Sequence, residues 1–144
     1  MKLVEEAREV IRNSSPSSSI YIGCDSVRKK KKGIVKYSIV VIVHMDSKHG
    51  CKLLHETITQ PDYGTMKQRL LNETYYAAGL ALELLEDIGD RHLEIHLDIN
   101  SKASEKSNVA VKEALGYCRG LGIETKIKPD AFAASHGADK ITRH

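Results

Sequence analysis

The spacing of apolar residues predicts a strand-rich segment that begins near residue 20. Three stretches alternate in polarity or run together in β-branched residues, and short polar turns separate them, which is typical of an antiparallel meander. We expect these strands at Ile20–Asp25, Ile34–His44 and Cys51–Thr59. The run Tyr37–Val43 inside the second stretch is dominated by β-branched side chains, so this strand should lie in the middle of the sheet.

After residue 64 the pattern changes to alternating helices and strands. The expected elements are a long helix at Thr65–Ile88, a strand at His92–Asp98, a helix at about Ser107–Arg119, a strand at Ile123–Lys128 and a short last helix that starts near Pro129. Strands joined through helices are parallel to one another. The predicted fold class is therefore α/β, with a five-stranded mixed sheet in the order βββαβαβα.

The first nineteen residues have a different character from the rest. Apolar residues at helical spacing predict a short helix over residues 3–12, and a serine-rich stretch then breaks the pattern. The whole chain has 144 residues, which suits a single domain with one core. We expect residues 1–19 to form an N-terminal helix and linker, and residues 20–144 to form the domain.

The amino-acid composition favours a soluble globular protein over a membrane protein. With 41% hydrophobic and 28% charged residues, the chain resembles ordinary soluble proteins, and it has no apolar run long enough for a membrane span. The first residues are too polar for a signal peptide, so we expect none. We therefore expect a cytoplasmic protein without a membrane partner. The net charge of +3 permits nucleic-acid binding without requiring it.

Histidine and cysteine give no reason to expect zinc. The three cysteines are an odd number without a CxxC pair, which argues against a disulfide framework and against a thiolate zinc site. A small group around the second turn (His44, His49, Cys51 and His55) matches no standard zinc spacing.

One acid interrupts the apolar face of the long helix. At 100° per residue with Met66 as zero, the core-facing stripe lies within about 60° of Met66, and Glu73 falls about 20° from Met66, inside the stripe. The stripe consists of Leu70, Ala77, Ala81, Leu84 and Ile88. An unpaired buried carboxylate is costly, so the position of Glu73 indicates a function.

Two further acids follow apolar strands. Asp25 is predicted to end the first strand and Asp98 the fourth, and sites in α/β sheets form at the carboxyl ends of strands. Each acid alone could be an ordinary loop-capping residue. If the two strands are neighbours, both acids lie side by side and Glu73 can reach them from the helix.

Three gathered carboxylates repel one another, and a bound cation offsets that repulsion. Oxygen ligands favour Mg²⁺ or Mn²⁺, and two such ions would support phosphodiester hydrolysis. We expect no small-molecule cofactor.

The order of elements and acids resembles the ribonuclease H-like superfamily, with acids at the first strand, the first helix and the fourth strand. More narrowly, the chain resembles the YkuK-type family of bacterial ribonuclease H-like proteins. The matching segments are Ile20–Ser26, Glu94–Asn100 and Lys126–Ser135. The resemblance implies a ribonuclease H-like fold and a two-metal nuclease. It also implies Asp139, on the last helix, as a fourth metal ligand, and His136 as a residue that transfers protons or helps product leave.

A basic run begins three residues after Asp25. It consists of Arg28, Lys29, Lys30, Lys31 and Lys32. The run could bind phosphates beside the acids and add salt-dependent affinity, or it could be a solvated turn. The predicted function is hydrolysis of RNA, RNA:DNA hybrid or structured DNA with Mg²⁺ or Mn²⁺. The alternative is a non-catalytic nucleic-acid-binding or adaptor module on the same fold, and the oligomeric state stays open.

Overall fold

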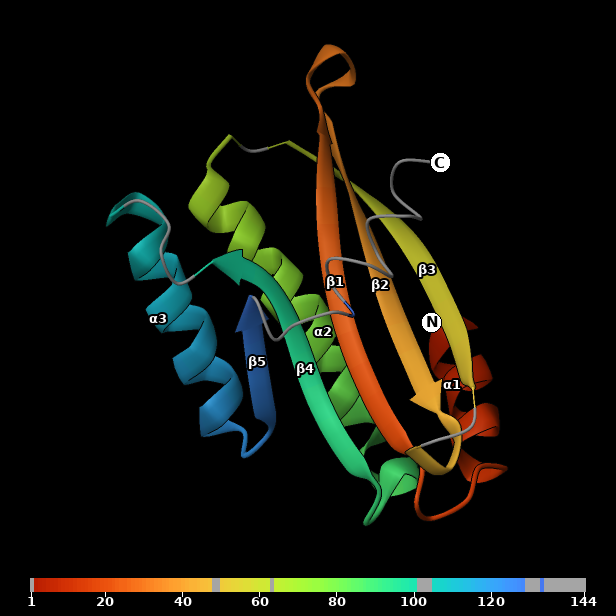
Figure 1. Ribbon diagram of the computed structural model, residues 1–144. Helices are drawn as coiled ribbons and strands as arrows, with labels where there is room; N and C mark the ends of the chain where they lie inside the picture. The colour runs from red at the N-terminus through yellow and green to blue at the C-terminus, as the bar shows by residue number, and fades with distance from the viewer. Residues whose placement is uncertain (1, 48–49, 63, 101–104, 129–132, 134–144) are drawn as a thin grey trace.

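The computed structural model describes residues 2–47, 50–62, 64–100, 105–128 and 133 (Figure 1). The elements are α1 (Lys2–Arg12), β1 (Ser19–Lys29), β2 (Ile34–His44), β3 (Cys51–Pro61), α2 (Met66–Ile88), β4 (His92–Asn100), α3 (Glu105–Gly120) and β5 (Glu124–Lys128). Single turns of 3₁₀ helix, η1 (Lys30–Lys32) and η2 (Met45–Ser47), follow β1 and β2. The predicted α/β fold with its ribonuclease H-like element order is confirmed. The helix expected after Pro129 lies outside the described residues.

One five-stranded mixed sheet organises the molecule, with the strand order β3-β2-β1-β4-β5. The pairs β1–β2 and β2–β3 are antiparallel, which confirms the predicted meander. The pairs β1–β4 and β4–β5 are parallel, as expected for strands that helices connect. Strands β1 and β4 therefore lie side by side in the middle of the sheet (Figure 1).

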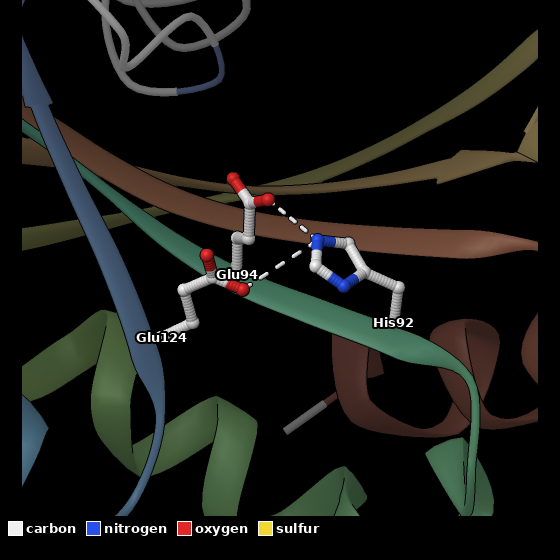
Figure 2. A group of neighbouring side chains, drawn as sticks. All are labelled: His92, Glu94 and Glu124. Atoms are coloured by element: carbon white, nitrogen blue, oxygen red, sulfur yellow. Dashed lines mark hydrogen bonds and ion pairs between the residues drawn. The ribbon is translucent and has the colours of Figure 1, made fainter.

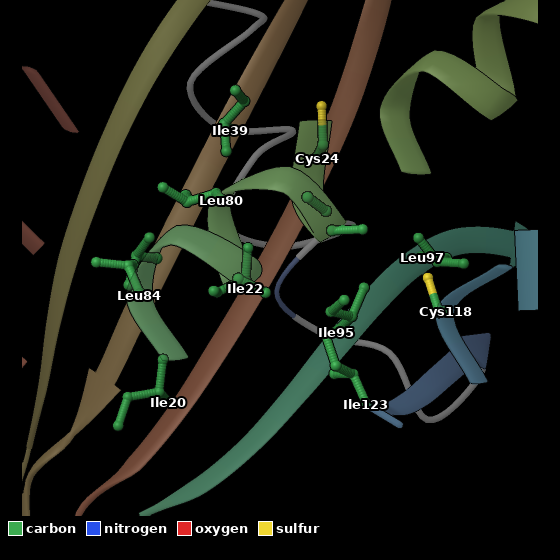
Figure 3. Close-up of a cluster of buried hydrophobic side chains, with 14 of the residues drawn as sticks. Ile20, Ile22, Cys24, Ile39, Leu80, Leu84, Ile95, Leu97, Cys118 and Ile123 are labelled. Carbon is green, nitrogen blue, oxygen red and sulfur yellow. The ribbon is translucent and has the colours of Figure 1, made fainter. Parts of the chain in front are cut away.

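The three helices contribute to a core on one face of the sheet. Alternate residues of β1 and β4 point to this face, among them Ile22 and Ile95, and they pack with Leu80 and Leu84 of α2 (Figure 3). From α3, Cys118 joins the same cluster. A fully buried aliphatic side chain contributes about 1.5–3 kcal/mol, so this core holds α2 firmly against β1.

The opposite face of the sheet carries a smaller buried cluster. Val40 and Ile42 of β2 pack there with Ala133, and Tyr21 of β1 packs against them. His96 of β4 is completely buried and lies beside the Tyr21 ring, with ring centroids 5.2 Å apart. Both faces of the central strands are therefore covered.

Helix α1 belongs to the main core. Its apolar residues Leu3, Val4, Ala7 and Ile11 are buried in the same cluster as those of α2. Arg8 and Arg12 of the same helix both bind the Asp87 carboxylate of α2, at 2.9 and 2.6 Å. This packing joins α1 to the core between the helices and the sheet. The division of the chain at residue 19 into an N-terminal segment and a domain stays a prediction.

Helix α2 begins and ends as its sequence predicts. The hydroxyl of Thr65 accepts a hydrogen bond from the Gln68 amide at 3.1 Å and so caps the first turn. Gly89 ends the helix with φ of 57°, a positive value that glycine adopts at little cost. None of the helices in the described part of the chain is long and apolar enough to cross a membrane.

Candidate metal centre

Asp25 lies inside β1, so the prediction that it ends the strand is wrong. The antiparallel pairing of β1 with β2 continues past Asp25, which faces Ser38, to Lys29. The parallel pairing of β1 with β4 stops one residue earlier, at Cys24 and Leu97. The apolar alternation stops near Asp25 and so suggests that the strand ends there. Backbone pairing with β2 extends the strand to Lys29. Asp25 nevertheless sits at the carboxyl end of the β1–β4 pairing.

Asp98 follows Leu97 and so occupies the adjacent position on β4. Strand β4 also continues beyond the predicted end, to Asn100, and its pairing with β5 is irregular between His96 and Asn100. The two strands are parallel neighbours, so the condition under which Asp25 and Asp98 lie side by side is met.

Glu73 reaches this point from α2. Its side chain is buried, with 5% of the residue exposed. Burial raises the pKa of Glu73 well above its ordinary value, and the negative charges of Asp25 and Asp98 raise it further. The charge of Arg69 and the nearby Ser26 hydroxyl oppose the rise in pKa. The structure therefore brings the three predicted acids close enough to interact electrostatically.

The same environment acts on Cys24, which is 1% exposed. Burial raises the pKa of the Cys24 thiol well above its ordinary value, and the charges of Glu73 and Asp25 add to the effect. The neutral thiol is a poor ligand for a hard cation. The donor set at this point consists of carboxylate oxygens.

The three carboxylates are not packed into a tight ligand cage. In the described part of the chain, metal-ligating atoms of three residues lie within 4.8 Å of one another only at His92, Glu94 and Glu124. Asp25, Glu73 and Asp98 are spaced more widely than that. Mutual repulsion of like charges in a buried setting favours such spacing.

Arg69 lies near the three acids, and the sequence analysis did not identify it. It lies one helical turn before Glu73, and its charge lowers the pKa of both Glu73 and Asp62. Its Nε atom is buried and has no hydrogen-bond partner among the described residues. The four-residue spacing between Arg69 and Glu73 is the signal that could have identified it.

The structure divides the basic run into two parts. Arg28 lies in β1, where its guanidinium binds the Asp62 carboxylate and donates to the Gly64 carbonyl oxygen at 2.8 Å. The hydrogen bond from Arg28 lowers the pKa of Asp62. Lys29 ends β1, and Lys30–Lys32 form the exposed turn η1 at the tip of the β1–β2 hairpin. Arg28 thus fixes the loop before α2, while the four lysines face solvent.

Two predicted site residues, His136 and Asp139, lie outside the described residues. Ala133, three residues before His136, is described. The Ala133 amide donates a hydrogen bond to Nδ1 of His96, at 3.1 Å, on the face of the sheet opposite to the helices.

A second group of possible metal ligands lies at the other end of β4 and was also missed. Figure 2 shows the imidazole of His92 facing both Glu94 of the same strand and Glu124 of β5. The two glutamates are thirty residues apart in sequence but face each other in the β4–β5 register. Only the strand pairing brings these side chains together, so no local sequence pattern predicts the group.

Comparison with known proteins places this arrangement in a family. A family model described as ribonuclease H-like matches residues 2–143. The chain belongs to the ribonuclease H-like family. This ribonuclease H-like chain is 27% identical, over 157 aligned positions, to the protein named uncharacterized protein YkuK of Bacillus subtilis (strain 168). The alignment covers 97% of the chain and 89% of that relative, which supports the expected resemblance to YkuK-type proteins.

A solved structure, the native prototype foamy virus protease-reverse transcriptase, is also similar to the ribonuclease H-like chain. The identity is 14% and the TM-score is 0.45. The similar part covers 90% of this chain and 21% of the viral chain, so the chain spans about a fifth of that protein.

Proposed function

We propose that the protein is a divalent-metal-dependent nuclease, with Asp25, Glu73 and Asp98 as metal ligands. The burial of Glu73 in the helix–sheet core, beside two other acids, carries this proposal. A buried carboxylate surrounded by like charge is costly, and a bound cation converts the cost into a favourable interaction. Membership of the ribonuclease H-like family supports nucleic acid as the substrate.

The donor set fits Mg²⁺ or Mn²⁺. The ligands are carboxylate oxygens, and the one nearby sulfur, that of Cys24, is kept protonated by its high pKa. Two such ions, when bound, would activate a water molecule and stabilise the leaving oxygen of a phosphodiester. We assign Asp139 to the same site as a fourth ligand and His136 to proton transfer or product release, as the superfamily resemblance implies.

The chain's own residues would hold the site in position. Asp25 and Asp98 directly follow the last β1–β4 pair, Cys24 and Leu97, and the packing of α2 on these strands positions Glu73. Arg69 supplies a positive charge at one side of the acids. The exposed lysines of η1 would bind phosphates of a long substrate, which predicts strongly salt-dependent affinity.

The proposed substrates are RNA, RNA:DNA hybrid or structured DNA, and we propose a cytoplasmic location for this activity. Purified protein is incubated with hybrid, duplex RNA, single strands and branched DNA, with Mg²⁺ or Mn²⁺. We expect metal-dependent cleavage of at least one substrate by the wild-type chain.

The Asp25→Asn variant tests the role of the acids. It removes one proposed ligand charge and keeps the shape of the side chain, so we expect it to lose cleavage while its circular dichroism spectrum is unchanged. Asp90→Asn, in the exposed turn after α2, is the matched control and should cleave at the wild-type rate. Equal cleavage by Asp25→Asn and the wild type would refute the proposal. Salt-sensitive binding without turnover, on every substrate and with either metal, would favour the non-catalytic binding module instead.

A further inference from the structure

The strongest feature outside the acidic site is the group of His92, Glu94 and Glu124 at the start of β4 and β5 (Figure 2). Glu94 lies four residues before Asp98 on β4, a separation of about 13 Å along a strand. The group is therefore distinct from the site of Asp25, Glu73 and Asp98.

Three donor atoms of this group lie close together. The Nε2 atom of His92 is 2.5 Å from Oε2 of Glu94 and 3.8 Å from Oε2 of Glu124. One imidazole nitrogen and one oxygen from each carboxylate thus lie together, within 4.8 Å of one another. His92 and Glu124 are about half exposed, so a cation can reach them from solvent.

Each carboxylate is oriented by another residue. Glu94 uses its second oxygen, Oε1, to accept a hydrogen bond from Nε2 of the buried His96, at 2.9 Å. The Ala133 amide donates to Nδ1 of His96, which places the imidazole proton on Nε2 and makes it the donor to Glu94. Glu124 uses its second oxygen to bind Lys126 at 3.2 Å. One oxygen of each glutamate is therefore left on the His92 side.

The strand register places two carboxylates opposite each other, and His92 and Lys126 lie against them. Glu94 and Glu124 are direct partners in the β4–β5 ladder, and like charges opposite each other destabilise a sheet. Outer residues that hold a ligand in its orientation, as His96 holds Glu94, are typical of metal sites. The Tyr21 ring also contacts the His92 ring edge to face, with centroids 6.3 Å apart, and so restricts the imidazole.

We propose that His92, Glu94 and Glu124 form a second metal site, which binds a first-row transition dication of the Zn²⁺ class. One nitrogen and two oxygen donors suit Zn²⁺, whereas Mg²⁺ prefers oxygen ligands alone. Three protein ligands leave a coordination position open to water. A bound ion would also join the edge strand β5 to β4.

Calorimetric titration of the full chain with Zn²⁺ at neutral pH tests the site. We expect Zn²⁺ to bind this group with an affinity that falls about tenfold or more in His92→Ala and in Glu124→Gln. His55→Ala, which removes an exposed histidine of β3, is the matched control and should keep the wild-type affinity. Asp25→Asn should also keep it, because the two sites are separate. Zn²⁺ affinity that is unchanged in both His92→Ala and Glu124→Gln would overturn the proposal, as would the absence of Zn²⁺ binding by the wild type.

A second measurement identifies the ligands without relying on affinity. In nitrogen-15 NMR spectra of the histidine side chains, one equivalent of Zn²⁺ should shift the Nε2 signal of His92 and leave that of His55 unchanged. The same amount of Mg²⁺ should shift neither signal. An unshifted His92 signal at full Zn²⁺ occupancy would refute the assignment.

Discussion

Replacing Glu73 with glutamine should stabilise the metal-free protein while it removes a proposed ligand. Glutamine has almost the same shape as glutamate, so it fits the buried position and carries no charge. In the wild type, burial and the charges of Asp25 and Asp98 raise the pKa of Glu73 well above the ordinary value of 4.5. A raised pKa means that the folded state retains a proton that the unfolded state has already released.

The size of the effect follows from that single proton. As the pH rises from 4.5 toward the folded-state pKa of Glu73, the folded chain binds up to one more proton than the unfolded chain. The contribution of Glu73 to stability is thus fully present below the unfolded pKa and is lost as the pH rises. The free energy of unfolding should fall by up to about 1.4 kcal/mol per pH unit in this window. Glu73→Gln has no such proton, so this part of the slope should vanish.

Urea unfolding followed by circular dichroism, with a chelator present and at several pH values between about 5 and 8, measures the difference. We expect Glu73→Gln to become more stable than the wild type as the pH rises. Glu86→Gln, at an exposed position of the same helix, is the control and should follow the wild-type curve. Addition of Mg²⁺ should then stabilise the wild type more than Glu73→Gln, because only the wild type has all the proposed ligands. Parallel pH curves for the wild type and Glu73→Gln would refute the reasoning about this buried acid.

Three further predictions concern the scaffold and the hairpin. Ile11→Ala should lower the free energy of unfolding by about 2–5 kcal/mol, because this side chain of α1 is completely buried; an effect near zero in urea unfolding would show that α1 lies apart from the core. Thr65→Ala removes the cap that accepts from the Gln68 amide and should cost about 1 kcal/mol in the same assay, whereas Thr65→Ser should keep most of the stability. Changing Lys30–Lys32 to glutamine should weaken nucleic-acid binding at low salt, and the slope of log affinity against log salt should fall by about 1 for each lysine that contacts a phosphate; an unchanged slope would mean that η1 is only a solvated turn.

The sequence predicts most of the elements because their signals are local. The β-branched run in β2 and the apolar stripe of α2 lie within single elements, and the observed bounds of these two elements agree closely with the predicted ones. The position of Glu73 in that stripe predicts its burial, because helical phase alone brings the residue to the core face.

The ends of strands are harder to predict, because a partner strand can extend them. Residues 26–29 look like the start of a turn, yet β2 holds them in the antiparallel ladder. The sequence alone likewise groups Arg28 with the four lysines that follow it. Its binding to Asp62 joins β1 to the loop before α2, and residues thirty-four positions apart give no local signal for that contact.

Contacts that depend on strand register could not be predicted from the sequence. Glu94 and Glu124 become neighbours only through the parallel pairing of β4 with β5, which no periodicity within either strand specifies. The hydrogen bond that the Ala133 amide donates to His96 likewise joins residues thirty-seven positions apart, which no local pattern specifies. Both contacts belong to the second group of possible ligands, so that group was missed.

The most direct test of the central claim is a crystal of the full chain soaked in Mn²⁺, with data collected to give an anomalous difference map. The account predicts anomalous peaks bound by the carboxylates of Asp25, Glu73 and Asp98, which are lost in crystals of Glu73→Gln. A map without a peak at these three carboxylates, at an Mn²⁺ concentration that supports cleavage in solution, would contradict the account.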